Sequence, residues 1–178
     1  MQTLQGEKIN LRALEPTDLE FLYQLENDES IWQMSNTTQP FSKYVLKEYL
    51  ANSHRDIYEV KQLRLVICTT NNKKTIGFLD LFDFEPKHRR AGIGILIFNV
   101  EERGKGYAAE ALRLIANYAK GHLNMHQLYA NIMADNDRSI QLFKKAGYVK
   151  SGVKRDWIVS AKGFQDELLY QLLLNGEG

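Results

Sequence analysis

The residues with the clearest chemical potential lie in the segment 103–108, which reads Arg103, Gly104, Lys105, Gly106, Tyr107, Ala108. This segment joins an apolar run, Ile93–Phe98, to a stretch with helical apolar spacing. Its glycines let the backbone pass close to a ligand, and the first turn of a helix leaves amide N–H groups without partners. Such groups favour an anion, so the segment predicts a phosphate-binding loop. A plain strand-to-helix turn with solvated charges is the alternative.

The loop does not match the common nucleotide-binding patterns. It lacks the G-x-x-x-x-G-K-[ST] sequence that holds nucleoside triphosphates. It also lacks G-x-G-x-x-G with an acidic residue at the end of a second strand, which is typical of dinucleotide binding. The sequence therefore argues against a nucleoside triphosphatase and against a dinucleotide dehydrogenase.

Four acidic residues are candidates for proton transfer or cation binding. A strand over 75–84 would place Asp80 on one face with Ile76, Phe78, Phe82 and Phe84. Burial of that face would raise the pKa of the Asp80 carboxyl toward a value suited to a general base, although a hydrogen-bonded structural carboxylate is equally compatible. Asp83 and Glu85 fall on the opposite face. Together with Glu26 they are expected to hold a cationic substrate, unless they are simply solvated.

Composition and charge indicate a single domain over residues 1–178. The apolar content is 44%, enough for a substantial core, and 23 basic residues nearly balance 22 acidic ones. Without an overall field, neither nucleic acid nor a membrane is expected as a partner, and we expect no metal. The single cysteine, Cys68, is expected in the core. Because 1–13 is too polar for a secretory signal and no apolar run approaches ~20 residues, we expect a cytoplasmic protein.

Hydrophobic periodicity predicts a mixed α/β order without repeats or linkers. Strands are expected at 9–13, 62–70, 75–84, 90–98, 128–134, 148–153 and 167–174, and helices at 16–27, 43–54, 108–121 and 137–146. The polar segment 33–40 is expected to be a loop, and 71–74 a hairpin turn.

Two motifs at compatible spacing carry a family resemblance. Arg103, Gly106 and Ala108 fit the signature [QR]-x-x-G-x-[GA], and the second motif consists of Asn136, Ser139, Gly147 and Tyr148. On these residues the chain resembles the GNAT superfamily of acetyl-CoA-dependent N-acetyltransferases. Further similarity to the spermidine and ribosomal-protein acetyltransferase branches lies in Leu11–Glu15, His88–Ala91, Gly163 and Asp166. The resemblance covers nearly the whole chain.

The resemblance implies a fold, a co-substrate and a set of binding residues. The fold would be a central mixed, splayed sheet of about six to seven strands flanked by about four helices. Acetyl-CoA would enter the splay, with pantetheine on the backbone of Phe98 and Val100 and near Asn136. Its pyrophosphate would lie on Arg103–Ala108. Gly92 and Gly94, on one face of the strand 90–98, would leave room for the pantetheine arm.

One departure from the family pattern affects the chemistry. Many relatives carry Tyr as general acid where this chain has Phe143. Coenzyme A would then leave as a thiolate, or Ser139 or a water would donate the proton. The expected reaction is direct attack of a primary amine, on a protein N-terminus or a small molecule. A polyamine acceptor and a catalytically silent acyl-CoA-binding module are the alternatives. A homodimer is possible.

Overall fold

Seven strands form one sheet in the order β1-β2-β3-β4-β5-β7-β6, and the computed structural model that contains it describes residues 2–174. The strands are β1 (Ile9–Arg12), β2 (Leu63–Thr69), β3 (Thr75–Glu85), β4 (Arg90–Ile97), β5 (Gln127–Met133), β6 (Val149–Ser160) and β7 (Gly163–Leu173). The α-helices are α1 (Leu19–Glu26), α2 (Glu29–Ser35), α3 (Lys43–Ala51), α4 (Ile57–Val60), α5 (Tyr107–Gly121) and α6 (Asp137–Lys145). The 3-10 helices are η1 (Gln2–Leu4), η2 (Pro16–Asp18) and η3 (Val100–Glu102).

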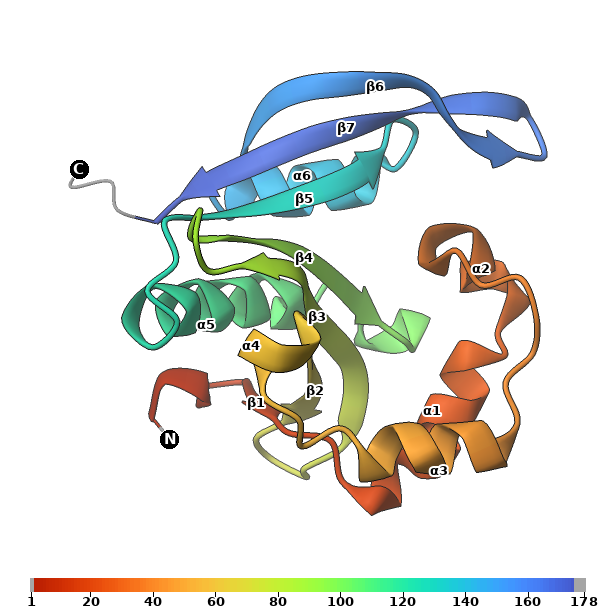
Figure 1. Cartoon of the computed structure of the whole chain (residues 1–178), viewed down its shortest axis with the longest axis vertical. Helices are drawn as coiled ribbons and strands as arrows, with labels where there is room; N and C mark the ends of the chain where they lie inside the picture. Colours follow the sequence, from red (N-terminus) through yellow and green to blue (C-terminus); the bar gives the residue numbers. More distant parts are fainter. Residues whose placement is uncertain (1, 175–178) are drawn as a thin grey trace.

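The sheet is splayed at its one parallel pair of strands. β4 and β5 pair only through Arg90 with Gln127, Ala91 with Leu128, and Gly92 with Tyr129. Their other neighbours, β3 and β7, pair antiparallel along nearly their full lengths. Beyond Gly92 the two strands diverge, so their facing backbones remain unpaired in the middle of the sheet (Figure 1).

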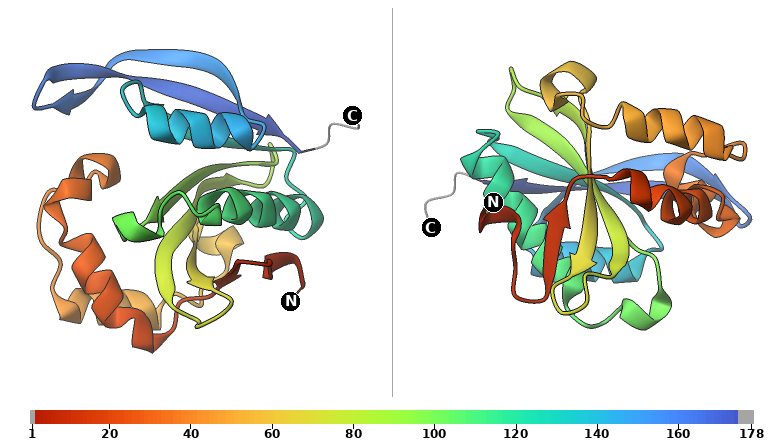
Figure 2. Two further views of the ribbon diagram at one scale, coloured as in Figure 1. Left: turned by 180° about the vertical axis from the view of Figure 1, so that it is seen from behind. Right: turned by 90° about the horizontal axis from the view of Figure 1, so that it is seen from below.

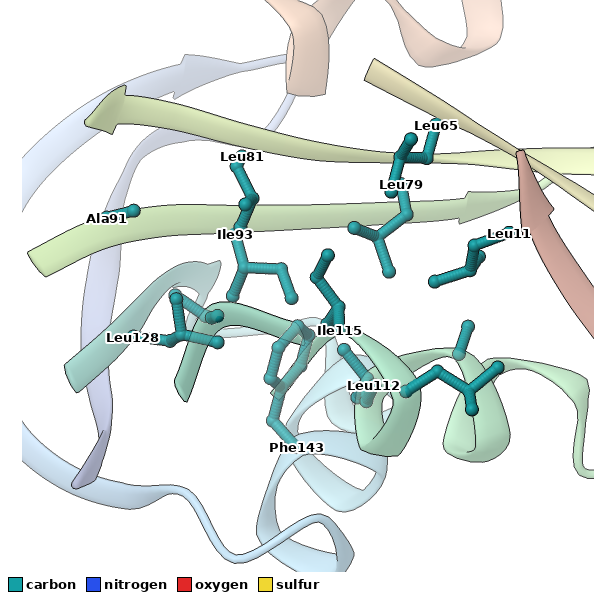
Figure 3. Close-up of a cluster of buried hydrophobic side chains, with 14 of the residues drawn as sticks. Leu11, Leu65, Leu79, Leu81, Ala91, Ile93, Leu112, Ile115, Leu128 and Phe143 are labelled. Atoms are coloured by element: carbon teal, nitrogen blue, oxygen red, sulfur yellow. The ribbon is translucent and has the colours of Figure 1, made fainter. Parts of the chain in front are cut away.

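Helices cover the two faces of the sheet around separate clusters of buried side chains. The larger cluster joins α5 and α6 to the sheet, with Leu112, Ile115 and Phe143 packed near Ile93 and Leu128 (Figure 3). The amphipathic apolar stripe of α5 explains why this helix lies flat against the strands. The smaller cluster places α1 and α3 on the other face, where Leu22 and Leu46 contact Val66 and Phe78. The views from behind and below show these helices on opposite sides (Figure 2).

The expected mixed α/β fold and its main elements are confirmed, but some elements were missed. Helix α2 was not predicted, and its last residues lie in the segment from residue 33 that was expected to be a polar loop. None of its side chains is fully buried, although Ile31 packs against the smaller cluster. Its N-cap is Asp28, whose carboxylate accepts from the amide of Ser30. A helix of only seven residues is too short to show a repeated apolar stripe, which is why its spacing gave no signal. The single-turn helix α4 was also missed.

Strands β6 and β7 are much longer than the predicted 148–153 and 167–174. They form a hairpin that extends past the body of the sheet (Figure 1). Register irregularities between Lys150 and Gly152 and between Lys154 and Ile158 break the alternation of β6. Because a β-bulge shifts later side chains to the other face, the outer part of this hairpin has no two-residue period to read.

The predicted face of β3 is partly wrong for the same reason. Ile76 and Phe84 lie in the α5-side cluster and do not share the Asp80 face. The pairing of β3 with β4 shifts register between Phe82 and Glu85, where Asp83 has φ 46°. The pairing of β3 with β2 also shifts, and Ile76 is the residue of β3 that it leaves without a partner. Each irregularity moves one aromatic or aliphatic side chain away from the Asp80 side. Phe78, in contrast, lies in the smaller cluster next to the Asp80 region.

Candidate active site

The predicted phosphate loop connects β4 and α5 with its backbone amides open. Gly104 and Gly106 have φ of 76° and 84°, a region that favours glycine. Gly106 is the residue before the first turn of α5, and within the described residues the amides of Gly104, Lys105 and Gly106 donate no hydrogen bond. A contact with the N-terminal segment supports the loop, because Lys8 Nζ donates to the Lys105 carbonyl at 3.1 Å. The loop can therefore accept an anion without rearranging its own hydrogen bonds.

A cavity of about 550 Å³ opens above this loop. Its walls are the end of β4, the start of α5 and one side of α6, including Ile97, Arg103, Tyr107, Ala108 and Arg138. Arg103 does not point freely outward, since its Nε donates to the Ile97 carbonyl at 3.3 Å. The cavity combines open amides, basic side chains and an apolar floor. That combination fits a ligand with phosphates at one end and an uncharged arm.

A second cavity, of about 340 Å³, lies in the opening between β4 and β5. It is lined by Gly94 on β4, Asn131 on β5, Glu26 on α1, Met34 on α2 and Trp157 on β6. We call it the acceptor cavity, and the one above the loop the coenzyme cavity. Both cavities share a boundary made of Met34, Ile95, Leu96, Asn136 and Ser139. A group transferred from one ligand to the other would pass there.

Asn136 and Ser139 shape this boundary from the start of α6. The Asn136 side-chain oxygen accepts from the Ser139 amide at 3.1 Å and caps the helix. The amide nitrogen of Asn136 remains available to a ligand, as does the Ser139 hydroxyl, because neither donates a hydrogen bond in residues 2–174. The Asn-x-x-Ser motif thus fixes the helix and offers two polar groups to both cavities.

The wall of the acceptor cavity contains a three-residue ion cluster that the sequence did not reveal. Arg64 on β2 donates to both carboxylate oxygens of Asp80, from Nε at 2.7 Å and from Nη2 at 2.8 Å. Its Nη1 donates to Glu26 Oε1 at 2.6 Å. Burial lowers the pKa of Arg64, but the carboxylate of Asp80 and its hydrogen bonds raise it above the ordinary value. The guanidinium therefore stays charged and ties α1 to the sheet.

Gly94 explains why Asp80 still reaches the cavity. Arg64, Asp80 and Gly94 are cross-strand neighbours on β2, β3 and β4. A Cβ atom at Gly94 would meet nothing within 4 Å, so the space beside the carboxylate is open. At Gly92, in contrast, the Phe82 ring already occupies that space. Of the two glycines predicted to leave room, only Gly94 faces a gap.

Several predicted residues lie outside both cavities. The amide of Phe98 donates to the Ile76 carbonyl at 2.8 Å, so only its carbonyl could pair with a ligand. Val100 is exposed, in the 3-10 helix η3 before the loop. Asp83 and Glu85 lie near the β3–β4 hairpin, past the paired end of β4 and β5, and Glu85 accepts from the Lys87 amide. The structure does not bring these acids together with Glu26.

Phe143 is buried and lines the acceptor cavity, and among the described residues that line this cavity there is no tyrosine. Its ring packs edge-on against Tyr148, with centroids 4.9 Å apart. The Tyr148 hydroxyl is buried without a partner in the described chain, and burial raises its pKa. Tyr148 does not line either cavity, so Ser139 is the hydroxyl at the boundary.

Arg64, Met34, Trp157 and Glu167 are among the cavity residues that the sequence reasoning missed. A guanidinium in an apolar strand was a usable signal, because a buried arginine requires an acidic partner. Met34 and Trp157 could not be found, since they depend on α2 and on the outer hairpin. Glu167 belongs to a predicted strand, but its place beside the cavity comes from the pairing of β7 with β5. No group of three or more His, Cys, Asp or Glu side chains in residues 2–174 could hold a metal ion.

This geometry fits an enzyme that would bring a phosphate-bearing coenzyme and a second substrate together from two sides of one boundary. The chain matches the family model described as an acetyltransferase (GNAT) domain over residues 8–149. It is 30% identical over 147 residues to a spermidine N(1)-acetyltransferase of Vibrio cholerae, covering 83% of this chain and 82% of that protein. An Escherichia coli spermidine N(1)-acetyltransferase is 28% identical over 172 residues, covering 97% and 82%.

A solved structure agrees with this relationship. The crystal structure of spermidine N-acetyltransferase from Vibrio cholerae in complex with CoA and spermine has a TM-score of 0.81 and 27% identity, covering 95% of this chain and 97% of that one. The chain belongs to the GNAT acetyltransferase family. It is an N-acetyltransferase that uses acetyl-CoA, which sets aside the silent binding module.

Proposed function

We propose that the acceptor is a small aliphatic polyamine, acetylated on a primary amine. The observation that carries this proposal is the charge of the acceptor cavity. Its lining includes three carboxylates, from Glu26, Asp80 and Glu167, and one guanidinium, from Arg64. Lys154 reaches Glu167 at 3.1 Å from outside the cavity. An excess of carboxylates favours a cation, and the apolar side chains between them suit methylene groups.

The shape of the cavity supports a small acceptor over a protein N-terminus. Helix α2 faces the β6–β7 hairpin across the opening (Figure 1). The two rims are joined, because Gln33 Nε2 on α2 donates to the Val159 carbonyl on β6 at 2.9 Å. A folded protein would have to separate these rims, whereas a slender amine would not. The two spermidine acetyltransferases among the relatives point the same way.

The coenzyme cavity supplies the other half of the site. The loop amides and basic side chains of 103–108 would hold the pyrophosphate, and Asn136 the pantetheine arm. Acetyl-CoA supplies a thioester whose carbonyl carbon the amine nitrogen attacks directly, forming the C–N bond as the C–S bond breaks. Met34, Ile95 and Leu96 would exclude bulk water from the boundary where this occurs.

Asp80 and Ser139 would move the protons. An alkylammonium has a pKa of ~10.4 and must lose a proton before it attacks. Each Asp80 oxygen accepts one hydrogen bond from Arg64 and keeps a second lone pair, and the space at Gly94 on the neighbouring strand is open. Asp80 would therefore accept that proton directly or through a water. Glu26 would hold the ammonium with Oε2, the oxygen that does not bind Arg64. The Ser139 hydroxyl or a water would protonate the departing thiolate.

The test is the rate of thiol release from acetyl-CoA with spermidine, spermine, putrescine, butylamine and an alanine-initiated peptide. We expect saturable release with the polyamines and at least about tenfold lower kcat/KM with butylamine, which lacks a second ammonium for the carboxylates. Asp80→Asn should lower kcat, whereas Glu26→Gln should mainly raise KM. Asp135→Asn, an exposed carboxylate outside the cavities, is the matched control.

Equal kcat/KM for butylamine and spermidine would contradict the polyamine proposal. Preference for the peptide would assign the acceptor to protein N-termini. If Asp80→Asn kept full kcat across pH, Asp80 would not be the base. A homodimer stays a prediction of the sequence, measurable by sedimentation.

A further inference from the structure

The coenzyme cavity contains a carboxylate that none of the proposed steps uses. Glu102 ends the 3-10 helix η3, directly before the phosphate loop, and it lines the cavity. Only 12% of its side chain is exposed, although the two lysines it contacts are nearly half exposed. A partly enclosed carboxylate is unexpected in a cavity that must take an anionic ligand.

Glu102 binds two ammonium groups whose lysines lie next to, and not in, the lining of the coenzyme cavity. Its Oε1 accepts from Lys74 Nζ at 2.8 Å, and its Oε2 accepts from Lys105 Nζ at 2.9 Å. Lys74 comes from the β2–β3 turn, whereas Lys105 belongs to the loop itself. These hydrogen bonds lower the pKa of Glu102, so the carboxylate is ionised at neutral pH. The cluster has one negative and two positive charges.

We propose that Glu102 sets the affinity for coenzyme A by competing with its phosphates for Lys74 and Lys105. Coenzyme A carries a pyrophosphate and a 3′-phosphate, all anionic. A phosphate near the loop meets repulsion from Glu102 and attraction from lysines already engaged by it. Binding is thereby weaker than the loop alone would allow. When the product leaves, the lysines return to Glu102, so its carboxylate also speeds release of the coenzyme.

The proposal rests on the placement of the coenzyme above the loop. The experiment therefore tests placement and affinity separately, by calorimetry with coenzyme A. Gly106→Trp tests the placement, because a side chain there would enter the loop at a φ of 84° that only glycine accepts easily. Unchanged binding by a folded Gly106→Trp protein would remove the placement and with it the proposal.

Glu102→Gln tests the affinity. We expect it to bind coenzyme A about 3- to 30-fold more tightly, with slower dissociation in a displacement experiment and a steeper loss of affinity with salt. Glu101→Gln is the matched control, since Glu101 is exposed and is outside the set of residues that line the cavity in the described chain. It removes the same charge one residue away and should change affinity by less than about twofold.

Three results would overturn the proposal. Unchanged affinity in Glu102→Gln would mean that the carboxylate does not compete with the phosphates. Weaker binding would mean that Glu102 instead orders the lysines for the ligand. An equal gain in Glu101→Gln would assign the effect to net charge. Lys105 is tested by making Glu102→Gln in a Lys105→Ala background. If Glu102→Gln raised the affinity for coenzyme A there as much as it does in the wild-type background, Lys105 would be excluded as the shared partner.

Discussion

Two arginines with bidentate carboxylate partners serve different purposes in this protein. Arg64 joins Asp80 and Glu26 in the wall of the acceptor cavity. Arg12 on β1 donates to both oxygens of Asp18, at 2.8 Å each, far from either cavity. The planar guanidinium matches two carboxylate oxygens at once in both pairs. A bidentate arginine–carboxylate pair thus supports the acceptor cavity in one place. In the other it holds the segment directly before α1.

Asp18 provides a pH-dependent test of the fold. Burial alone would raise the pKa of Asp18, but the hydrogen bonds from Arg12 and from the Glu15 amide outweigh it and leave the pKa below its ordinary value. A carboxyl with a lower pKa in the folded state stabilises the fold above the unfolded pKa of ~3.9, and this contribution is lost as the pH falls through the folded value.

We therefore expect Asp18→Asn to lower the free energy of unfolding by about 1–3 kcal/mol at pH 7, because the Arg12 guanidinium loses its charged partner. Below about pH 4 the difference from wild type should shrink. Urea unfolding of both proteins at pH 7 and pH 3.5 measures it, with exposed Asp135→Asn as control. A gap that is equal at both pH values would contradict this account.

At the scale of elements, the divergence of β4 from β5 creates the site. The three residue pairs that join them stop at Gly92, two residues before Gly94. Two rows beyond Gly92, on the same face of the sheet, the row Arg64–Asp80–Gly94 borders the opening, with an ion pair on β2 and β3 and no side chain on β4. The strand pairing therefore decides which carboxylate meets a ligand.

Gly94→Val tests this role of the splay. The new side chain meets no atom at its Cβ and suits a strand, so the free energy of unfolding should be unchanged or slightly higher. It would occupy the gap beside Asp80, so kcat/KM for the amine should fall at least about tenfold. The affinity for coenzyme A should not change, because Gly94 does not line that cavity within the described residues.

Gly121→Ala is the matched control for this variant. Gly121 ends α5 and also has open space at its Cβ, but it lies outside both cavities. Steady-state kinetics and urea unfolding of the two variants separate a filled site from a general effect of a larger side chain. Wild-type kinetics for a stably folded Gly94→Val protein would show that the acceptor does not lie beside Asp80.

At the scale of the whole molecule, the coenzyme cavity joins parts of the chain that pack around different clusters. Its walls come from β4, α5 and α6, and Met34 of α2 completes them. Helices α1 and α3 pack around the smaller cluster, on the opposite face from α5.

None of the helices within residues 2–174 is long and apolar enough to cross a membrane.

Coenzyme A should consequently stabilise the whole fold. A ligand at 100 times its Kd adds about 2.7 kcal/mol to the free energy of unfolding. For a chain of 178 residues, this corresponds to a rise in Tm of roughly 5–10 °C. Thermal unfolding followed by circular dichroism, with and without coenzyme A, measures the shift. The Gly106→Trp protein should lose it, and an equal shift there would argue against a site above the loop.

The sequence by itself determined what depends on local periodicity and local backbone demands. Alternation over β2 to β4 and the apolar stripe of α5 are local patterns, so these elements were predicted nearly to their ends. The glycines at 104 and 106 marked the loop, because positive φ leaves few alternatives. Asn136 and Ser139 were found through the resemblance to the family motif, and the structure shows that their spacing is that of a helix cap.

Only the tertiary structure decided which side chains meet. Asp80 was singled out for its aromatic neighbours, yet its actual partner, Arg64, lies 16 residues away along the chain. Two register irregularities in β3 removed Ile76 and Phe84 from its face, and Asp83 and Glu85 lie away from Glu26. Helix α2 and the outer β6–β7 hairpin carry no apolar period, so Met34 and Trp157 were invisible. Pairing across strands depends on register, which one bulge changes without altering the composition of the chain.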